Sequence, residues 1–206
     1  MGGGTRLLLV GALLAAAPVR ADRGALSFDL GAGAAGLSLP APYASSGDKA
    51  LGVGFEAMLG VRYAVFNELE FTLAAYFEPN VTYTHDDVTV TTGGDLHGTL
   101  THSLYFFGVL GGVRYVTGLV WKLVVGLESG WSHRVYSRFQ GTDQLSIVSF
   151  PDFSTDNIVF QPLLGVEWSF ADHWSTSLLS RFTVLVGPDP TIGVSVMLSI
   201  SYSWFL

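Results

Sequence analysis

The residues best suited to chemistry are histidines that lie close to carboxylates. His85 is followed by Asp86 and Asp87, and His102 comes after a Gly-Gly pair at 93–94. If that pair forms a two-residue turn between strands, position 85 falls opposite position 102, and two imidazoles near carboxylates can hold a divalent metal. The pairing joins an odd to an even position, so it requires a bulge. We treat His85 and His102 as weak metal candidates, favour a solvated polar loop, and expect no cofactor.

Catalytic combinations of side chains are poorly represented. The pairs His102-Ser103 and Ser132-His133 are adjacent in sequence, and adjacent residues on a strand point to opposite faces, so they cannot share a proton. The chain has no Cys, which excludes thiolate catalysis and a disulfide framework. It also lacks a phosphate-binding loop and an Asp-rich calcium pattern. We therefore expect no enzymatic activity.

The composition indicates a chain that meets a solvent other than water over much of its surface. Charged residues make up 13% of the sequence, about half the usual share of a soluble domain. Mean hydropathy is +0.43 and aromatic residues reach 13%. Beyond the N-terminus there is no run of about 18 apolar residues, which disfavours a helical membrane span. Two fold classes remain, an unusually apolar soluble β-protein and a membrane β-barrel.

The N-terminus resembles a secretory signal. Arg6 precedes an apolar stretch at 7–17, and Val19-Arg20-Ala21 fits the small-x-small cleavage pattern. We expect residues 1–21 to be a cleaved signal peptide and 22–206 to be the mature domain. Removal of Arg6 and Arg20 from the 10 basic residues leaves 8 against 17 acidic residues, a net charge of -9. That balance excludes nucleic acid as a partner.

A repeated motif divides the chain into strand, turn and strand. GVRY occurs at 60–63 and at 112–115, and GVEW occurs at 165–168. A short turn-like stretch follows each copy, and a new alternating run then opens. With two further alternating runs, period-two patterning predicts eight strands. The expected strands are 24–38, 50–63, 69–79, 102–115, 119–131, 158–168, 174–186 and 192–206.

Alternation separates the side chains of these strands into two faces. One face holds every charged residue of the strands, namely Asp29, Glu56, Arg62, Glu70, Glu78, Arg114, Lys122, Glu128, Glu167 and Arg181. The other face is apolar and carries large aromatic residues near the turns, namely Tyr63, Tyr115, Trp121, Trp168, Trp174, Tyr202 and Trp204. We expect the first set to form an interior charge network and the second to form a belt at a membrane interface.

A soluble barrel of the lipocalin type is the main structural alternative. It would turn its polar face to water, and that face should then be rich in Lys and Glu. Here the polar face is mostly Gly, Ser, Ala and Thr with charges of both signs. An eight-stranded barrel has room inside only for side chains, so small residues and paired ions suit its interior. The sequence therefore predicts an all-β, eight-stranded, antiparallel, up-and-down transmembrane barrel.

The C-terminal run VSVMLSISYSWFL places apolar residues at alternate positions. With the alternation and the short turns, this run resembles the eight-stranded outer-membrane barrels typified by OmpX and the membrane domain of OmpA, with OmpW-like proteins close by. The resemblance covers 22–206 as architecture. It implies localisation in the outer membrane of a Gram-negative envelope and recognition of the last strand by the assembly machinery. Leu206 stands where such barrels usually end in Phe.

Connection lengths predict the orientation. In such barrels the periplasmic turns are short and the outer loops are long, so we expect both termini on the periplasmic side. The connections at 80–101 and 132–157 continue to alternate. We therefore expect strands three to six to protrude outside the cell as long hairpins. Ordinary disordered loops are the alternative.

The favoured function is a structural or surface-interaction role. The expected partners are the lipid bilayer, lipopolysaccharide, the outer-membrane assembly machinery, and an extracellular ligand or protein at 80–101 and 132–157. Two sets of residues are candidates for contact. The aromatic residues, which either meet a partner or pack over the barrel mouth, are Tyr136, Phe139, Phe150 and Phe153. The basic residues, which are candidates for contact with lipopolysaccharide phosphates, are Lys49, Arg134 and Arg138.

Two other functions remain open. One is a narrow channel for small apolar compounds, resembling OmpW, which needs an apolar opening in the lumen. The other, less favoured, is an enzyme that modifies outer-leaflet lipid. His173-Trp174-Ser175 spells the His-x-Ser step of the lipid A deacylases, but it lies at an expected periplasmic turn, away from the outer leaflet.

Overall fold

The computed structural model describes residues 23–46, 49–90, 96–142, 147–188 and 190–205. The expected signal peptide at 1–21 and the Gly-Gly turn at 93–94 lie outside these residues. Within them, no helix has the length and apolarity needed to cross a membrane. Almost all of the described chain is strand.

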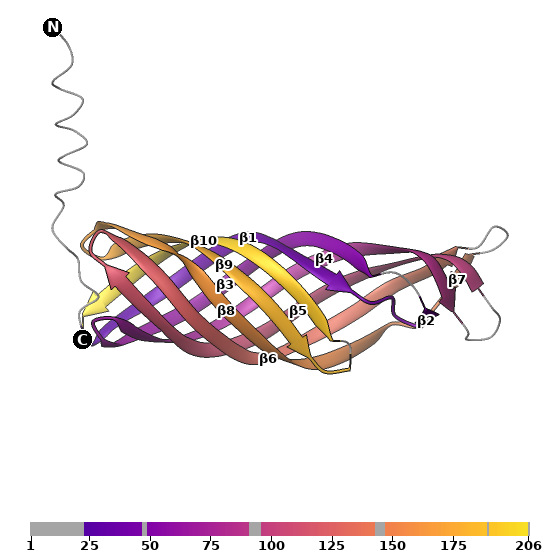
Figure 1. The fold of residues 1–206 in the computed structure, drawn as a ribbon, viewed down its shortest axis with the longest axis horizontal. Helices are drawn as coiled ribbons and strands as arrows, with labels where there is room; N and C mark the ends of the chain where they lie inside the picture. Colours follow the sequence, from indigo (N-terminus) through magenta and orange to yellow (C-terminus); the bar gives the residue numbers. More distant parts are fainter. Residues whose placement is uncertain (1–22, 47–48, 91–95, 143–146, 189, 206) are drawn as a thin grey trace, which may run out of the picture.

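Eight long strands form the wall of a barrel (Figure 1). They are β1 (Ala25–Leu39), β3 (Ala50–Phe66), β4 (Leu69–Val90), β5 (Leu96–Gly118), β6 (Trp121–Thr142), β8 (Phe153–Ala171), β9 (Trp174–Val186) and β10 (Thr191–Phe205). Each pairs antiparallel with the strand before and after it, and β1 pairs with β10 to close the ring. The predicted all-β, eight-stranded, antiparallel barrel is therefore confirmed.

The alternation of the sequence becomes the inside and outside of the wall. Along β10 the pattern of buried and exposed residues alternates strictly from Thr191 to Ser201. Small and polar residues point inward, because the interior of a narrow barrel has little room. Large apolar residues point outward: Leu198 is 60% exposed and Leu59 is 61% exposed.

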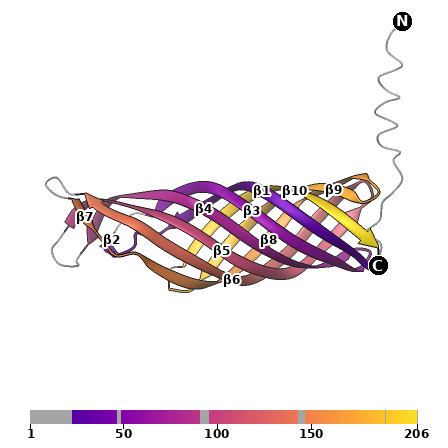
Figure 2. The same ribbon diagram turned by 180° about the vertical axis from the view of Figure 1, so that it is seen from behind.

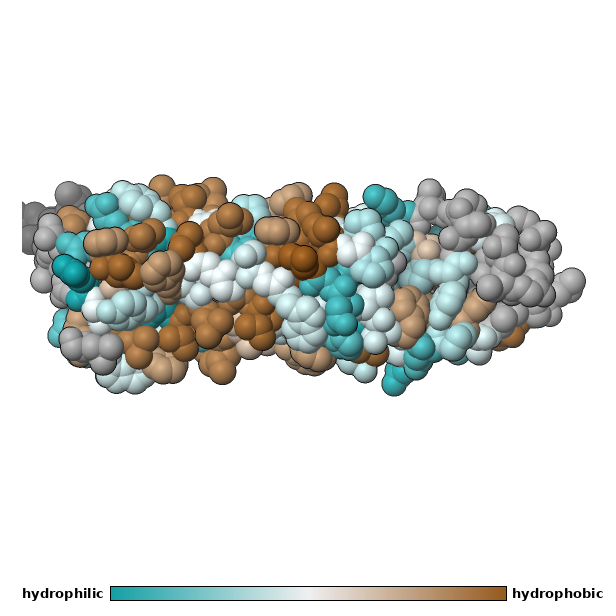
Figure 3. Space-filling view, turned by 90° about the horizontal axis from the view of Figure 1, so that it is seen from below, coloured by the Kyte–Doolittle hydropathy of each residue, from teal (hydrophilic) through white to brown (hydrophobic). Residues whose placement is uncertain are grey.

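These outward residues form an apolar belt, the brown surface of Figure 3. Members of the belt include Leu30, Leu59, Leu73, Val113, Leu127, Leu164, Leu178 and Leu198. Phe107 and Trp131 lie at its rim farthest from the tight turns, and Tyr115 and Trp121 lie at the rim beside them. An apolar exterior of this extent is stable in hydrocarbon rather than in water.

Four strands continue beyond the belt. Residues 78–90 of β4, 96–106 of β5, 132–142 of β6 and 153–157 of β8 form an extension that we call the tower (Figures 1 and 2). The short strand β2 (Ala44–Ser46) pairs with β4 at its far end, and β7 (Ile147–Ser149) pairs with β6. The start of β1 and the end of β10 lie together at the opposite end of the barrel (Figure 2).

The pairing between β3 and β4 breaks off before either strand ends. The ladder between β3 and β4 ends at Ala57 opposite Phe77, although both strands continue. Over 50–56, β3 pairs only with β1 in the described chain. The break coincides with an irregularity between Glu78 and Val81 that contains Pro79, which has no N–H for a ladder hydrogen bond. We call the gap between 50–56 of β3 and 78–84 of β4 the seam.

Two glycines let β4 side chains lie across the inside of the seam. A Cβ at Gly52 would collide with the ring of Tyr83, and a Cβ at Gly54 would collide with the methyl group Cγ2 of Val81. Side chains therefore cover the seam from the inside where backbone pairing is missing. On the outside the seam is flanked by Val53, which is 69% exposed.

Candidate functional site

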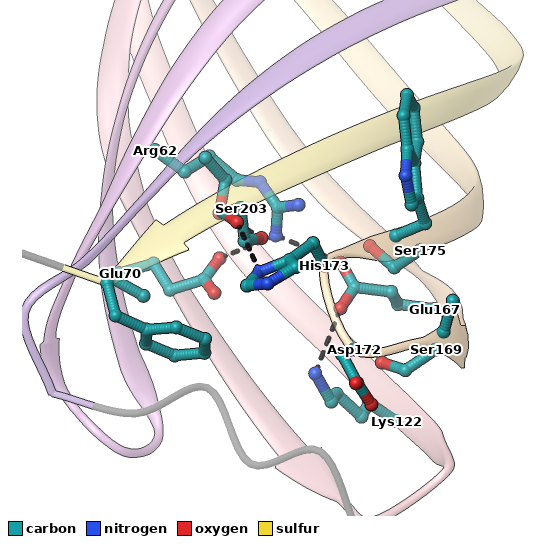
Figure 4. A pocket seen from close by; sticks show the side chains of 14 residues that line it. Arg62, Glu70, Lys122, Glu167, Ser169, Asp172, His173, Ser175 and Ser203 are labelled. Carbon is teal, nitrogen blue, oxygen red and sulfur yellow. Dashed lines mark hydrogen bonds and ion pairs between the residues drawn. The ribbon is translucent and has the colours of Figure 1, made fainter.

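The first candidate site is the interior at the end beside the tight turns. Arg62 contacts three carboxylates there: Nε lies 2.8 Å from Asp29, and Nη1 lies 2.9 Å from both Glu70 and Glu167. Lys122 Nζ lies 3.1 Å from the other oxygen of Glu167. Figure 4 shows Arg62, Glu70, Lys122 and Glu167 converging from the strands around the lumen. Because all are buried, each charge depends on its partners for solvation.

A second layer continues the network along the barrel. Arg114 Nη2 lies 2.8 Å from Glu128, and its Nη1 lies 3.9 Å from Asp29, which links the layers. Arg181 lies 3.2 Å from Glu56 and 3.7 Å from Glu128. All ten charged residues that the sequence assigns to the interior are buried. The described ion pairs join all of them except Glu78 into one connected network.

The network fills the inner half of the lumen. At the turn end it leaves a pocket of about 30 Å³, lined by Arg62, Glu70, Lys122, Glu167 and neighbouring serines. A space of that size holds about one or two waters.

The His-x-Ser step borders the same pocket (Figure 4). The imidazole Nδ1 of His173 lies 2.9 Å from the backbone carbonyl oxygen of Ser203. Ser203 Oγ is 2.8 Å from Ser27 Oγ. The imidazole is thus engaged with a backbone acceptor rather than with a serine hydroxyl, and the step lies at the end opposite the tower.

The second candidate site is the core of the tower, where aromatic rings and two histidines stack. The ring of His102 lies 5.2 Å from the ring of His85, with 9° between their planes. It also stacks on Tyr83 at 5.4 Å and on Phe139 at 5.2 Å. Both histidines are buried.

The register differs from the direct 85-to-102 pairing that the sequence suggested. His85 pairs with Leu100, and His102 pairs with Tyr83. The irregularity between Glu78 and Val81 shifts the alternation of β4, so its odd positions point inward over 81–85 although they point outward in the belt. A bulge was expected here, and the two histidines meet diagonally instead of face to face across the ladder.

This arrangement gives no metal centre among the described residues. No group of three or more His, Cys, Asp or Glu side chains there could hold an ion. Neither ring nitrogen of His102 has a hydrogen-bond partner in the described chain. Burial, reinforced by the neighbouring His85, lowers the pKa of His102 from 6.5 to about 3, so its ring is neutral at pH 7.

The outer aromatic residues close the tower rather than face solvent. Tyr136 and Phe139 are buried, and Phe153 stacks on Tyr136 at 4.5 Å. Tyr43 stacks on Phe150, and its hydroxyl donates to the carbonyl oxygen of Pro151 at 2.7 Å. The four aromatic residues considered for partner contact are therefore packed over the barrel mouth, which was the alternative given above.

The three basic residues considered for phosphate contact divide in the same way. Arg134 is fully buried, and its Nη1 donates to Tyr136 Oη and to Thr191 Oγ1, each at 3.0 Å. Lys49 and Arg138 are exposed. Arg134 therefore supports the interior and does not face a lipid headgroup.

The seven predicted interface aromatics all point outward near the tight turns. Five are exposed, whereas Trp168 and Tyr202 are half-buried. Trp168 stacks on Trp121 at 5.6 Å, and Tyr202 lies edge-on to Trp174 at 4.9 Å. A ring of mutually packed aromatics is the usual feature of a barrel at a membrane interface.

Sequence reasoning missed a polar and aromatic group at the opposite rim. Phe107, Trp131, His133 and Asp156 lie together on the outer wall. Continued alternation of β6 beyond residue 131 was the available signal for Trp131 and His133. Asp156 could not be placed, because its strand appeared in the sequence as a connection.

Comparisons with known proteins find structural likeness without sequence relatives. No family model matches the chain, and no curated protein matches it. OprG from Pseudomonas aeruginosa is 12% identical, with 90% of this chain and 99% of that chain covered and a TM-score of 0.54. Neisserial surface protein A is 14% identical over 87% of this chain and 99% of its own, with a TM-score of 0.51. Ail, the attachment invasion locus protein of Yersinia pestis, is 13% identical over 88% and 99%, with a TM-score of 0.50.

At these identities the likeness shows the fold. The exposed apolar belt supplies the independent physical reason for a membrane environment. The chain therefore has the fold of the small eight-stranded outer-membrane β-barrels.

Proposed function

We propose that this protein is an anchored surface-interaction barrel, which holds the tower outside the cell and conducts no solute through its lumen. The observation that carries the proposal is the contrast between the two halves. The inner half is filled by the ion network around Arg62, and the outer half extends beyond the belt as an ordered β-structure with its own aromatic core. A sealed barrel with a long extension suits display better than transport.

Tower orientation can be tested with single cysteines, because the chain has no Cys of its own. Asp86 is exposed on the tower, and Asn67 is exposed at a tight turn at the other end. We expect a membrane-impermeant maleimide to label Asp86→Cys in intact cells, and Asn67→Cys only after lysis. The reverse pattern would place the tower in the periplasm and contradict the proposal.

Conductance separates display from transport. In planar bilayers we expect the purified barrel to give no stable single-channel steps, because Arg62 and Arg181 and their carboxylate partners occupy the lumen. The control is the variant Arg62→Ala/Arg181→Ala, which lacks two of the cationic side chains that occupy the lumen. Reproducible steps from the unmodified protein would contradict a sealed lumen.

The seam favours a second candidate function. Small apolar compounds would move sideways through the seam, between the tower core and the outer leaflet. Apolar residues of the core, including Leu39 and Val88, lie inside the outer half of the barrel. A Cβ built on Gly54 would lie 3.6 Å from the Cβ of Val81, which suits a disulfide across the seam. If this route exists, oxidised Gly54→Cys/Val81→Cys should lose uptake of a small alkane, and reduction should restore it. Equal uptake in both states would exclude it.

We also infer that export and assembly use the two ends of the chain. Cleavage after Ala21 would release a mature protein that begins at Asp22, and β10 would be the strand recognised by the assembly machinery. Intact-mass measurement of the protein from outer membranes tests the first point. A mass that includes residues 1–21 would contradict it.

A further inference from the structure

The outer wall carries a group of side chains that the proposed function does not use. Phe107 of β5 pairs with His133 of β6, which pairs with Asp156 of β8, so the three form one row across three strands. Trp131 lies next to this row on β6. The rings of Phe107 and Trp131 meet edge to face at 5.8 Å, and the rings of Trp131 and His133 lie 5.9 Å apart. We call these four residues the rim patch.

One carboxylate organises the rim patch. Asp156 Oδ1 accepts from the indole Nε1–H of Trp131 at 3.1 Å and lies 2.8 Å from Nδ1 of His133. Its side chain is 64% exposed, and Oδ2 has no hydrogen-bond partner in the described chain. Binding through Nδ1 also leaves Nε2 of His133 as a second polar atom. The patch therefore offers two unused polar atoms beside two aromatic faces.

An ordinary interface belt does not require this arrangement. The chain has five Trp residues, and the other four lie near the tight turns. Within the described chain, none of those four donates a side-chain hydrogen bond to a carboxylate, whereas Trp131 does. A belt tryptophan normally finds water or lipid for its N–H, so a fixed indole indicates a prearranged surface.

The charge of the patch selects the chemistry of its ligand. Its carboxylate disfavours phosphate, and the neighbouring Arg134 is buried in the lumen, where it cannot compensate. A carboxylate oxygen accepts hydroxyl protons well, and aromatic faces pack against the C–H groups of a sugar ring. Aromatic faces beside hydroxyl acceptors therefore fit a saccharide better than a phosphate group.

The position of the patch identifies where such a saccharide comes from. Phe107 and Trp131 are the rim of the apolar belt, so the patch lies at the level where lipid headgroups meet the wall. A convex wall binds a free sugar weakly, but a lipid held in the same leaflet is present at high effective concentration. We propose that the rim patch binds the sugar headgroup of an outer-leaflet glycolipid through its hydroxyls.

Retention of defined lipids tests the proposal. The mature protein in detergent is incubated with lipid A, with dephosphorylated lipid A or with phosphatidylglycerol, and the lipid that remains bound is counted by native mass spectrometry. We expect both glycolipids to be retained equally and phosphatidylglycerol to be retained less. Asp156→Ala and Trp131→Phe should each lower glycolipid retention about five- to tenfold, the effect of one lost hydrogen bond or contact.

Matched variants separate this site from general lipid adhesion. Trp174 is as exposed as Trp131 but lies at the other rim, and Asp86 is an exposed carboxylate of the tower. Trp174→Phe and Asp86→Ala should retain glycolipid as the unmodified protein does. Equal retention by all variants, equal retention of phosphatidylglycerol, or loss on dephosphorylation would each overturn the proposal.

The inference rests on the outward placement of the tower, because glycolipid must lie in the leaflet at the patch. The cysteine-labelling experiment measures that placement independently of any lipid. Labelling of Asp86→Cys in intact cells, together with equal lipid retention by all variants, would contradict only the proposal that the rim patch binds glycolipid. Labelling of Asn67→Cys instead of Asp86→Cys in intact cells would contradict the proposed function.

Discussion

At the scale of single residues, buried charge is the feature on which this barrel depends most. Arg62 solvates three carboxylates at once, from β1, β4 and β8. Sequence alternation placed Arg62, Arg114 and Glu167 on the same face of their strands. It could not predict that Arg114 turns to Glu128, because that choice depends on the stagger of the closed ring.

Replacement of Arg62 should therefore be costly. Arg62→Ala leaves Asp29, Glu70 and Glu167 with less compensation in a buried layer, and such a loss costs about 3 to 5 kcal/mol of unfolding free energy. Urea unfolding in lipid vesicles measures the effect. Lys49→Ala, at an exposed position, should change stability by less than about 0.5 kcal/mol. A similar small effect at both positions would contradict the role of the network.

His102 should make the tower sensitive to acid. Its pKa is about 3 in the folded chain against 6.5 in the unfolded chain, so the unfolded chain binds more protons between these values. The contribution of neutral His102 to the unfolding free energy is therefore fully present above pH 6.5 and falls as the pH drops toward 3. It amounts to about 1.4 kcal/mol for each unit by which the pKa differs between the folded and the unfolded chain. The rings that contact His102 belong to Tyr83, His85, Tyr136 and Phe139, and none of these residues carries a carboxylate.

Hydrogen exchange of the tower amides at pH 7 and pH 4 measures this effect after correction for the intrinsic exchange rates. We expect protection in β4 and β5 to fall at pH 4, while the belt strands stay protected. His102→Phe keeps a stacked ring without a titratable nitrogen and should flatten the pH dependence. An unchanged pH dependence in that variant would assign the effect to another group.

At the scale of elements, alternation predicted the membrane strands closely, and it predicted that strands three to six continue beyond them, but not the register of that continuation. The expected 24–38 and 174–186 differ from β1 and β9 by at most one residue at each end. The membrane span 69–79 was expected to continue outward as part of a long hairpin, and β4 does continue, to Val90. Pro79 and the adjacent irregularity reverse the alternation there, so the period-two signal is interrupted although the strand is not.

The seam gives a prediction at the same scale. Gly52→Ala should destabilise the outer half by about 1 to 3 kcal/mol, because the new methyl group collides with the Tyr83 ring. Gly36→Ala is the matched control, since its Cβ would meet no atom nearer than 3.8 Å. In a double-mutant cycle with Tyr83→Ala, the cost of Gly52→Ala should largely disappear. Equal costs with and without Tyr83 would show that the ring is not the cause.

At the scale of the whole molecule, composition and alternation together determine the inverted arrangement, with apolar residues outside and ions inside. A low share of charged residues and a strict two-residue period leave few other folds for the chain. Contacts between distant segments were beyond the reach of such patterns. Tyr43 packs on Phe150 and Phe153 through a turn with a positive φ, and this contact decides that the aromatic residues close the tower rather than project from it.

The most direct test of the account is the environment of its outward side chains. Nitroxide labels are placed singly by cysteine substitution at Leu198, Leu123 and Leu164, which are exposed on the belt, and at Asp86 on the tower. In bilayers we predict that oxygen, which concentrates in hydrocarbon, relaxes the three belt labels, and that a water-soluble nickel complex relaxes only the label at position 86. Relaxation of the belt labels by the nickel complex would contradict an apolar exterior in lipid.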